Sequence, residues 1–403
     1  DPGLMAKAAQ SGTVPVLLVF PDQETPALTP LRLNTDVLER RRALVDALRT
    51  RADMKQAPVR AWLDARGIVH RAYWIANVIE ARLTAAQIDA LKARKDLARI
   101  ASNQALRQAL PVRDHTDATP KSLLARPWGI EKINAPQVWA SGVEGQGVVV
   151  AGADTGYQWD HPALKAQYRG WHGASVDHAY NWHDAVHDTG SDCGADSPAP
   201  CDDNDHGTHT MGTMIGTIPA GDVIGVAPQA RWIGCRNMNA GWGTPARYIE
   251  CMQWFLAPTD SAGNNPDPSR APDVINNSWT CVPDEGCATG EELRSAVNNV
   301  VAGGIFFVAS AGNSGPQCAS IFHAPATYAS SFAVAATNSG DALAGFSSRG
   351  PIPGATGVEL DIAAPGVSVY SSVRNNGYDS KGGTSMAGPH VAGVAALMMS
   401  VNP

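Results

Sequence analysis

Two short stretches place a reactive residue at the expected start of a helix. Ser385 lies in GTSMAGPHVAG, which begins at Gly383 and runs into the apolar residues 394–399. Glycines and a Thr-Ser pair favour a turn and a capping site, and the small residues behind them allow a helix to pack closely. His206 opens a second such stretch, HGTHTMGT. Because backbone N–H groups at a helix start favour an anion, Ser385 lies where a nucleophile could act.

A carboxylate completes the set, because Asp154 follows an apolar run and begins the sequence Asp-Thr-Gly. A serine hydroxyl is a weak nucleophile until a base removes its proton; a histidine can be that base, and a carboxylate can hold its ring in the right tautomer. Each of the three residues alone could be a simple cap or turn residue. The joint pattern predicts nucleophilic catalysis in the chain order Asp154, His206, Ser385. No GxSxG motif surrounds Ser385, which argues against an α/β-hydrolase.

The elements that must position these residues read as an α/β domain from about residue 128. Continuous apolar strands separated by helices predict a doubly wound parallel sheet that is covered on both faces. Functional residues of such sheets lie at the carboxyl ends of strands, where Asp154, Asn277 and Asn313 are expected. The five predicted strands are Val148–Ala151, Trp232–Cys235, Val274–Trp279, Ile305–Ala309 and Phe332–Ala336.

Residues 1–110 predict a separate small α+β domain with the order β-α-β-β-α-β, which is typical of ferredoxin-like folds. Its first helix is expected over 35–66, with a break near Pro58, and a strand or extended tail over 97–110. No catalytic constellation occurs in it, so we expect a helper domain. Residues 111–127 are polar and carry three prolines, which is linker composition.

Composition excludes several classes of protein. The 403 residues are 44% hydrophobic, and the chain has no run of eighteen apolar residues, so we expect a globular protein without a membrane span. The net charge of −7 divides into about +5 over the first 120 residues and about −12 over the rest, so the two parts can attract each other. No basic stripe suggests a nucleic-acid partner. The chain opens with Asp1-Pro2, and we expect that a signal peptide has been removed or that the chain has been trimmed.

All seven cysteines lie at or beyond Cys193. Cys193 and Cys201, like Cys281 and Cys287, are spaced as in short disulfide loops, and the remaining three leave at least one thiol unpaired. None has the paired CxxC spacing of a zinc site. An exported, oxidising location is therefore expected, extracellular or else periplasmic or cell-surface.

Four motifs together resemble the signatures of subtilisin-like serine proteases: DTG at Asp154, HGTHTMGT at His206, AGNSG around Asn313 and GTSMAGP around Ser385. The likeness covers about residues 128–400. WGI at Trp128, QWDHP at Gln158 and NNSW at Asn276 narrow the resemblance to the bacillopeptidase F branch.

The resemblance implies that Asp154 orients the base, His206 acts as general base and then acid, and Ser385 attacks the carbonyl. Asn313 and the backbone N–H of Ser385 would bind the oxyanion. Protein or peptide substrates would lie as an extended strand between two segments, with a pocket for the residue before the cut. The small, uncharged pocket walls favour large apolar or mixed side chains. The implied groove residues are Gly241, Trp242, Gly243, Ser278, Trp279, Thr280, Ser310, Ala311 and Gly312.

By the same resemblance residues 1–110 match an inhibitory propeptide, and residues 111–127 a linker and processing region. The end of the propeptide, residues 103–110, would occupy the active site, with self-cleavage at or near Leu110. The catalytic domain would be 128–403, acting as a monomer, and the family usually continues further than Pro403, so we expect a missing C-terminal segment.

No cofactor is required for this chemistry. Thr217 to Val223 has the length of the family's calcium loop, but Pro219 replaces an asparagine ligand, so that site is not carried over. The acidic residues 202–205 offer oxygen ligands, which keeps a structural calcium open and the metal unassigned. His206 and His209 lack the glutamate of a zinc motif.

Two other functions remain open at this point. An aspartic protease also carries DTG, but it needs two such turns and a mostly β fold. A catalytically inactive, subtilisin-like binding scaffold would need no triad, and the full set with Asn313 argues against it.

Overall fold

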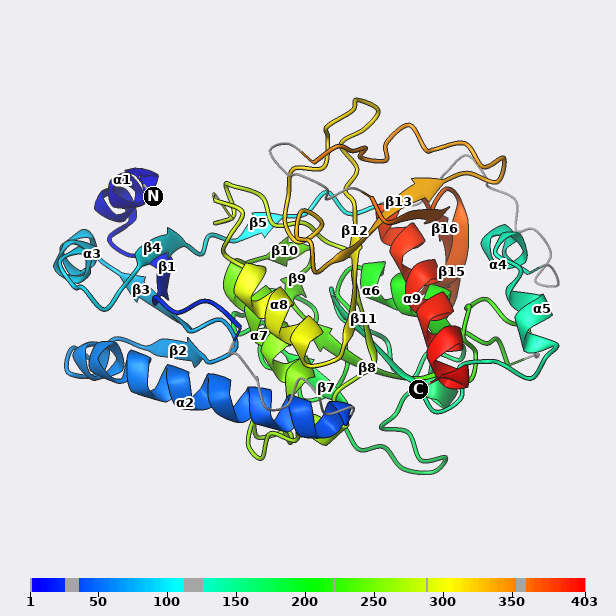
Figure 1. The fold of residues 1–403 in the computed structure, drawn as a ribbon, viewed down its shortest axis with the longest axis horizontal. Coiled ribbons are helices and arrows are strands. Elements are labelled where there is room, and N and C mark those ends of the chain that lie inside the picture. Colours follow the sequence, from blue (N-terminus) through cyan, green and yellow to red (C-terminus); the bar gives the residue numbers. More distant parts are fainter. Residues whose placement is uncertain are drawn as a thin grey trace.

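The structure, a computed structural model, describes residues 2–25, 36–111, 126–219, 222–287, 289–352 and 360–402. They form a small front part, at the left of Figure 1, and a large part that carries the central sheet. The linker expected at 111–127 lies almost wholly outside the described residues, as does Pro403. None of the described helices is long and apolar enough to cross a membrane.

The front part has the expected β-α-β-β-α-β order in an antiparallel sheet arranged β2-β3-β1-β4. Thr84 caps α3 with a reciprocal capping box to Gln87, as its sequence position suggests. One helix, α1, precedes the expected elements. The elements are α1 Pro2–Ser11, β1 Val14–Val19, α2 Val37–Asp64, β2 His70–Tyr73, β3 Val78–Leu83, α3 Ala85–Lys92 and β4 Arg99–Ser102.

The large part is built on a seven-stranded sheet in the order β14-β13-β12-β11-β6-β8-β7, and all its neighbouring strands are parallel. The five strands expected from apolar runs are all present, and two outer strands join them. The strands are β6 Val149–Asp154, β7 Trp182–Asp184, β8 Arg231–Arg236, β11 Val274–Asn277, β12 Phe306–Ser310, β13 Phe332–Thr337 and β14 Ile362–Pro365. The predicted doubly wound α/β fold is thus confirmed.

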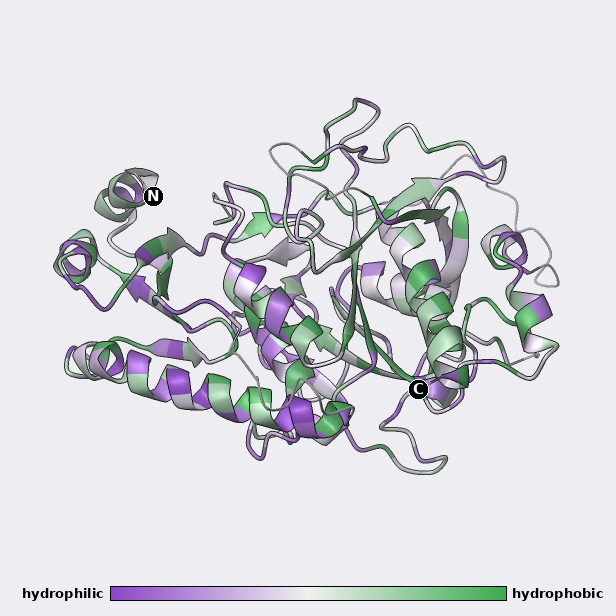
Figure 2. Cartoon of the chain, viewed as in Figure 1, coloured by the Kyte–Doolittle hydropathy of each residue, from purple (hydrophilic) through white to green (hydrophobic). Residues whose placement is uncertain are grey.

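Helices cover both faces of this sheet. Because successive strand residues point to opposite faces, Val150 packs with α6 and α9 while Ala151 packs with α7 and α8. Figure 2 shows the resulting apolar strands at the centre of the molecule. The helices are α4 Trp128–Lys132, α5 Ala135–Trp139, α6 His206–Ile215, α7 Pro245–Leu256, α8 Arg294–Ala302 and α9 Thr384–Val401, with 3-10 turns η1 Lys165–Gln167 and η2 Pro268–Arg270.

Two small sheets border the large one. β15 Val369–Val373 and β16 Gly377–Lys381 form a hairpin that packs on α6. The other sheet has the order β5-β10-β9 and joins the two parts of the chain, because β5 Leu106–Arg107 comes from the front part. Its partners are β9 Met238–Asn239 and β10 Trp242–Gly243. The expected strand or tail over 97–110 therefore divides between two sheets.

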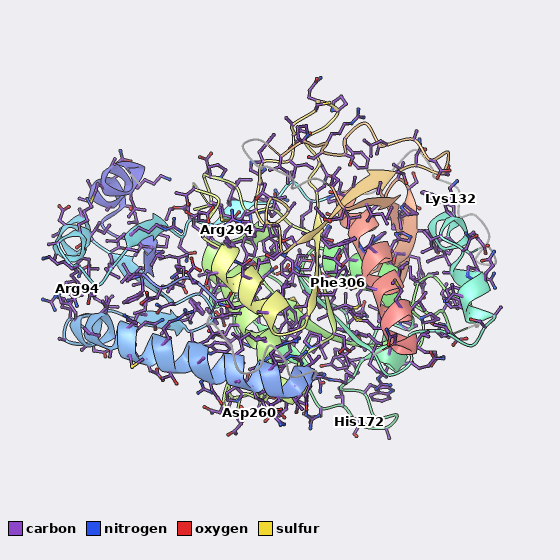
Figure 3. The ribbon with its side chains drawn as sticks, viewed as in Figure 1. Arg94, Lys132, His172, Asp260, Arg294 and Phe306 are labelled. Carbon is purple, nitrogen blue, oxygen red and sulfur yellow. A yellow bond between two sulfur atoms is a disulfide. The ribbon has the colours of Figure 1, made fainter. Side chains whose placement is uncertain are left out.

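The front part packs on the α7/α8 side of the large part. Helix α2 spans both: Leu44 and Leu48 belong to the core under α7 and α8, while Val59 and Leu63 belong to the front part's own core. The prediction of a helix break near Pro58 is wrong, because α2 continues through this proline. In Figure 3, Arg94 of the front part and Lys132 of α4 mark opposite ends of the molecule, and Arg294 lies on the side of the large part that faces the front part.

Candidate active site

The carboxyl edge of the large sheet carries the acidic residue of the expected triad. Asp154 is the last residue of β6, between β8 and β11, and it is only 1% exposed. Its Oδ1 accepts a hydrogen bond from the Thr155 backbone N–H at 2.7 Å and lies 2.7 Å from Nδ1 of His206. The strand end therefore aims the carboxylate at the start of α6.

His206 is the first residue of α6 and is fully buried. Because an ionised carboxylate only accepts hydrogen bonds, Nδ1 of His206 carries the proton and Nε2 keeps its lone pair in the neutral ring. This Nε2 atom makes no hydrogen bond to a described residue. The ring is thus held at one nitrogen and open at the other, as a general base requires.

A buried carboxylate next to Asp154 and His206 fixes the start of α6, a role that its sequence context does not reveal. Asp202 accepts hydrogen bonds from Thr155 Oγ1 (2.8 Å), from Thr208 N–H and Oγ1 (2.9 and 2.6 Å), and from the backbone N–H groups of Asn204 and Asp205. It thereby ties the turn after β6 to the first turn of α6. Its only sequence signal was the acidic run, which fits a metal site equally well.

A close backbone approach completes this docking. A Cβ atom on Gly207 would lie 2.0 Å from the carbonyl oxygen of Gly156 and 3.1 Å from the Asp154 Cβ. Only glycine fits there, which explains the glycine that follows the histidine in HGTH.

Ser385 is the second residue of α9, whose N-terminal end lies beside the end of β11. Its Oγ donates to the carbonyl of Ser278 at 3.2 Å, and no hydrogen bond joins it to His206. A rotation about one side-chain bond would redirect this hydroxyl, and catalytic hydrogen bonds are often formed fully only with substrate. The eighteen-residue α9 directs its positive dipole end at this serine.

Asn313 follows β12 and is held against the start of α9. Its Oδ1 accepts hydrogen bonds from Thr384 N–H at 2.9 Å and Thr384 Oγ1 at 3.0 Å. This pairing assigns the amide orientation, since the NH₂ group cannot accept them. Nδ2 is therefore turned away from Thr384 and lies 3.6 Å from the position that a Cβ on Gly383 would take, so it can donate to an oxyanion formed at Ser385.

Five of the expected groove residues line one cavity together with Ser385. A cavity of about 250 Å³ is lined by Ser278, Trp279, Thr280, Ser310 and Gly312, together with Asn313 and Ser385. Gly241, Trp242 and Gly243 lie on and beside β10, and Gln108 connects the two segments, because its backbone N–H donates to Gly241 and its side chain to Thr280. Ala311 is buried, and the Trp279 ring stacks on Tyr248 with 3.9 Å between centroids, so the groove side of Trp279 is its backbone.

The groove is occupied by the end of the front part. Trp242 pairs with Arg107 and Gly243 with Leu106 in an antiparallel ladder, and Gln108 N–H donates to the Gly241 carbonyl at 2.8 Å. Further along, a Cβ on Gly241 would lie 3.4 Å from Leu110, and one on Gly383 would lie 2.6 Å from Pro111. From β5 the chain thus runs to Gly383, which lies two residues before Ser385 in the sequence.

The acidic run 202–205 is engaged by the protein itself. Asp203 forms a buried ion pair with Arg236 at 3.0 Å, and Asp205 pairs with Arg374 at 2.7 Å. Burial raises the pKa of Asp203 to about 6 even though Arg236 opposes this shift. Across the described residues, no group of three or more His, Cys, Asp or Glu could hold a metal ion.

Burial, with Lys381 and His206 nearby, holds the pKa of His209 well below its usual value, and the Nε2 atom of His209 lies 3.0 Å from the carbonyl of Val369.

The two short disulfides expected from spacing, Cys193–Cys201 and Cys281–Cys287, are present. A third joins Cys235 to Cys251, linking β8 to α7. Cys318 is an exposed free thiol.

Residues 145–403 match the model of the subtilase family of peptidases. Bacillopeptidase F of Bacillus subtilis (strain 168) is 44% identical over 283 residues, which cover 68% of this chain and 19% of that protein. Subtilisin DY of Bacillus licheniformis is 36% identical over 281 residues, covering 69% and 85%. Alkaline elastase YaB of Bacillus sp. (strain YaB) is 36% identical over 288 residues, covering 71% and 63%.

Proposed function

The chain belongs to the subtilase family of subtilisin-like serine endopeptidases, and we propose that it hydrolyses peptide bonds with the triad Asp154, His206 and Ser385. The observation that carries this proposal is the buried 2.7 Å contact from Asp154 to His206 Nδ1, which leaves Nε2 without a hydrogen bond to a described residue. The Asp154–His206 pair argues against an aspartic protease, because Asp154 is committed to a histidine.

The proposed reaction proceeds through an acyl-enzyme. The Ser385 proton moves to His206 Nε2 while Oγ bonds to the substrate carbonyl carbon, and Asp154 stabilises the imidazolium. The tetrahedral oxyanion accepts hydrogen bonds from Asn313 Nδ2 and Ser385 N–H. His206 then protonates the leaving amine, the carbon–nitrogen bond breaks, and water repeats the cycle to release the acid. No step requires a metal or cofactor.

Residues 1–110 act in this proposal as an inhibitory propeptide, with 111–127 as the linker and processing region and 128–403 as the catalytic domain. The β5–β10 pairing supports it, because substrate-like strand addition blocks the groove. The positions of Leu110 and Pro111 support self-cleavage at or close to Leu110. We also propose a monomer.

Three disulfides support an oxidising location outside the cytoplasm. We therefore propose a secreted enzyme that acts on protein or peptide substrates.

Labelling with a fluorophosphonate probe tests the proposed function. The chain should be labelled at Ser385, and Ser385→Ala should abolish labelling. Ser400→Ala, on the same helix but far from the groove, is the matched control and should label normally. Labelling that persists in Ser385→Ala would refute the assignment of the nucleophile.

A further inference from the structure

A polar pocket at the far end of the groove holds the side chain of Gln108. Its Nε2 lies 2.7 Å from the Thr280 carbonyl, 3.1 Å from Tyr248 Oη and 3.2 Å from Glu285 Oε2. Tyr248 Oη in turn donates to Glu285 Oε1 at 2.6 Å. One amide group therefore faces three acceptors that belong to the large part of the chain.

Glu285 takes no part in the proposed triad chemistry, but several features of the structure fix its position. It is fully buried and lies in the loop that the Cys281–Cys287 disulfide closes. The Tyr248 ring is fixed by its stack on Trp279. A Cβ on Gly243 would lie 1.8 Å from Tyr248 Oη and 2.9 Å from Glu285 Oε1, so glycine at the groove wall makes room for this pair. The acceptors are therefore pre-positioned.

The pocket favours a neutral partner. Burial raises the pKa of Glu285 to about 8, although hydrogen bonds from Tyr248 and Gln108 oppose the shift. At neutral pH the carboxyl is then largely protonated, and a glutamine amide can pair with it without burying a net charge. A side chain of similar shape without N–H groups would leave buried acceptors unpaired, and a carboxylate there would bury a charge and bring no donor for these acceptors.

We propose that Glu285, with Tyr248, is a specificity-determining residue that selects a glutamine-type amide side chain at the substrate residue that takes the place of Gln108. The inference rests on the proposed endopeptidase function. It makes the front part's own sequence a guide to preferred substrates, two residues before Leu110.

The test uses the full chain after self-processing and internally quenched peptides with the sequence of residues 104–115. The peptides carry Gln, Met or Glu at the position of Gln108, and mass spectrometry locates the cut. We expect kcat/KM for Gln to exceed that for Met by about 10- to 100-fold, with Glu lower than Gln by at least as much.

Two variants assign the preference to the pocket. Glu285→Ala should reduce the Gln-to-Met ratio to about threefold or less. Tyr248→Phe keeps the stack on Trp279 and should also lower the ratio, so the test survives if Glu285→Ala fails to fold. Glu291→Gln changes an exposed carboxylate of the same region and should leave the ratio as in the unaltered chain.

The outcomes separate this inference from the function on which it rests. Hydrolysis of all peptides with a Gln-to-Met ratio near one, or a ratio unchanged in both pocket variants, overturns the role of Glu285 alone. Absence of both hydrolysis and fluorophosphonate labelling overturns the endopeptidase proposal and this inference with it.

Discussion

At the residue scale, the orientation of the Asn313 amide is the most direct link between geometry and rate. Thr384 occupies Oδ1, so the NH₂ group is left free of Thr384 for the oxyanion that we propose it binds. We expect Asn313→Ala to lower kcat about 10²- to 10³-fold with little change in KM, because the lost hydrogen bond strengthens only in the transition state. Steady-state kinetics on one quenched peptide measures this. Asn265→Ala, in an exposed loop, is the control, and a loss confined to KM would contradict the assigned role.

The contacts of His187 predict that the free energy of unfolding depends on pH. Its Nε2 lies 2.9 Å from Glu250 and its Nδ1 2.6 Å from Asp196, so both nitrogens face carboxylates and the ring is favoured as imidazolium. Burial alone would lower the pKa of His187, but Glu250 and Asp196 outweigh it and raise the pKa to about 8. A raised pKa stabilises the fold fully below the unfolded value, about 6.5, and this contribution is lost as pH rises through about 8.

The expected size of this contribution is about 2 kcal/mol in the free energy of unfolding. Urea unfolding in the Ser385→Ala background, at pH 6 and pH 9, measures it. His187→Gln should remove this part of the pH dependence, and His172→Gln, an exposed site, should not. Equal pH dependence in His187→Gln and the parent would refute the contribution.

At the element scale, α6 can dock on β6 only through a glycine. In Gly207→Ala the new methyl group would overlap the Gly156 carbonyl, so α6 must shift and carry His206 with it. We expect a loss of about 1–3 kcal/mol in unfolding free energy and at least tenfold in kcat. Denaturant unfolding and peptide hydrolysis measure the two effects. Gly345→Ala is the matched control, because its Cβ meets nothing within 4 Å; similar losses in both variants would be inconsistent with this explanation.

The elements that could be predicted from sequence are those whose signal is local. Apolar runs predicted β6, β8, β11, β12 and β13, because parallel strands are buried on both faces. β14 starts with exposed residues and β7 has only three, so neither gives a run. Pro58 misled the prediction for α2: Met54, whose carbonyl loses its partner, is 65% exposed, so that carbonyl lies on the solvent side of the helix.

The same distinction explains what could be predicted of the site. Asp154, His206, Asn313 and Ser385 each stand in a short motif. Glu285 does not, because its proposed role depends on contacts with Tyr248, 37 residues earlier in the chain, and with Gln108, 177 residues away. Likewise, nothing local distinguishes a carboxylate that binds metal from Asp202, whose partners come from two elements.

At the scale of the whole molecule, the chain should process itself. We expect purified material to shorten with time to a product whose N-terminus lies within residues 104–128, because β5 of the front part pairs with β10 at the groove as a substrate strand is proposed to do. The Ser385→Ala chain should keep its full mass, and Ser400→Ala should shorten as the parent does. Intact-mass spectrometry and N-terminal sequencing follow this, and a new terminus far outside 104–128 would rule out the assigned processing region.

The front part also binds the large part through hydrogen bonds outside the groove. Arg41 donates to the Gly303 carbonyl at 2.7 Å, Tyr73 to Glu250 at 2.9 Å, and Asn299 to the Ile75 carbonyl at 2.6 Å. A cut near Leu110 severs the covalent tether and leaves each of these contacts intact. Proteolytic activity should therefore rise only after a delay. The length of this delay would be set by dissociation or digestion of the bound front part rather than by the first cut.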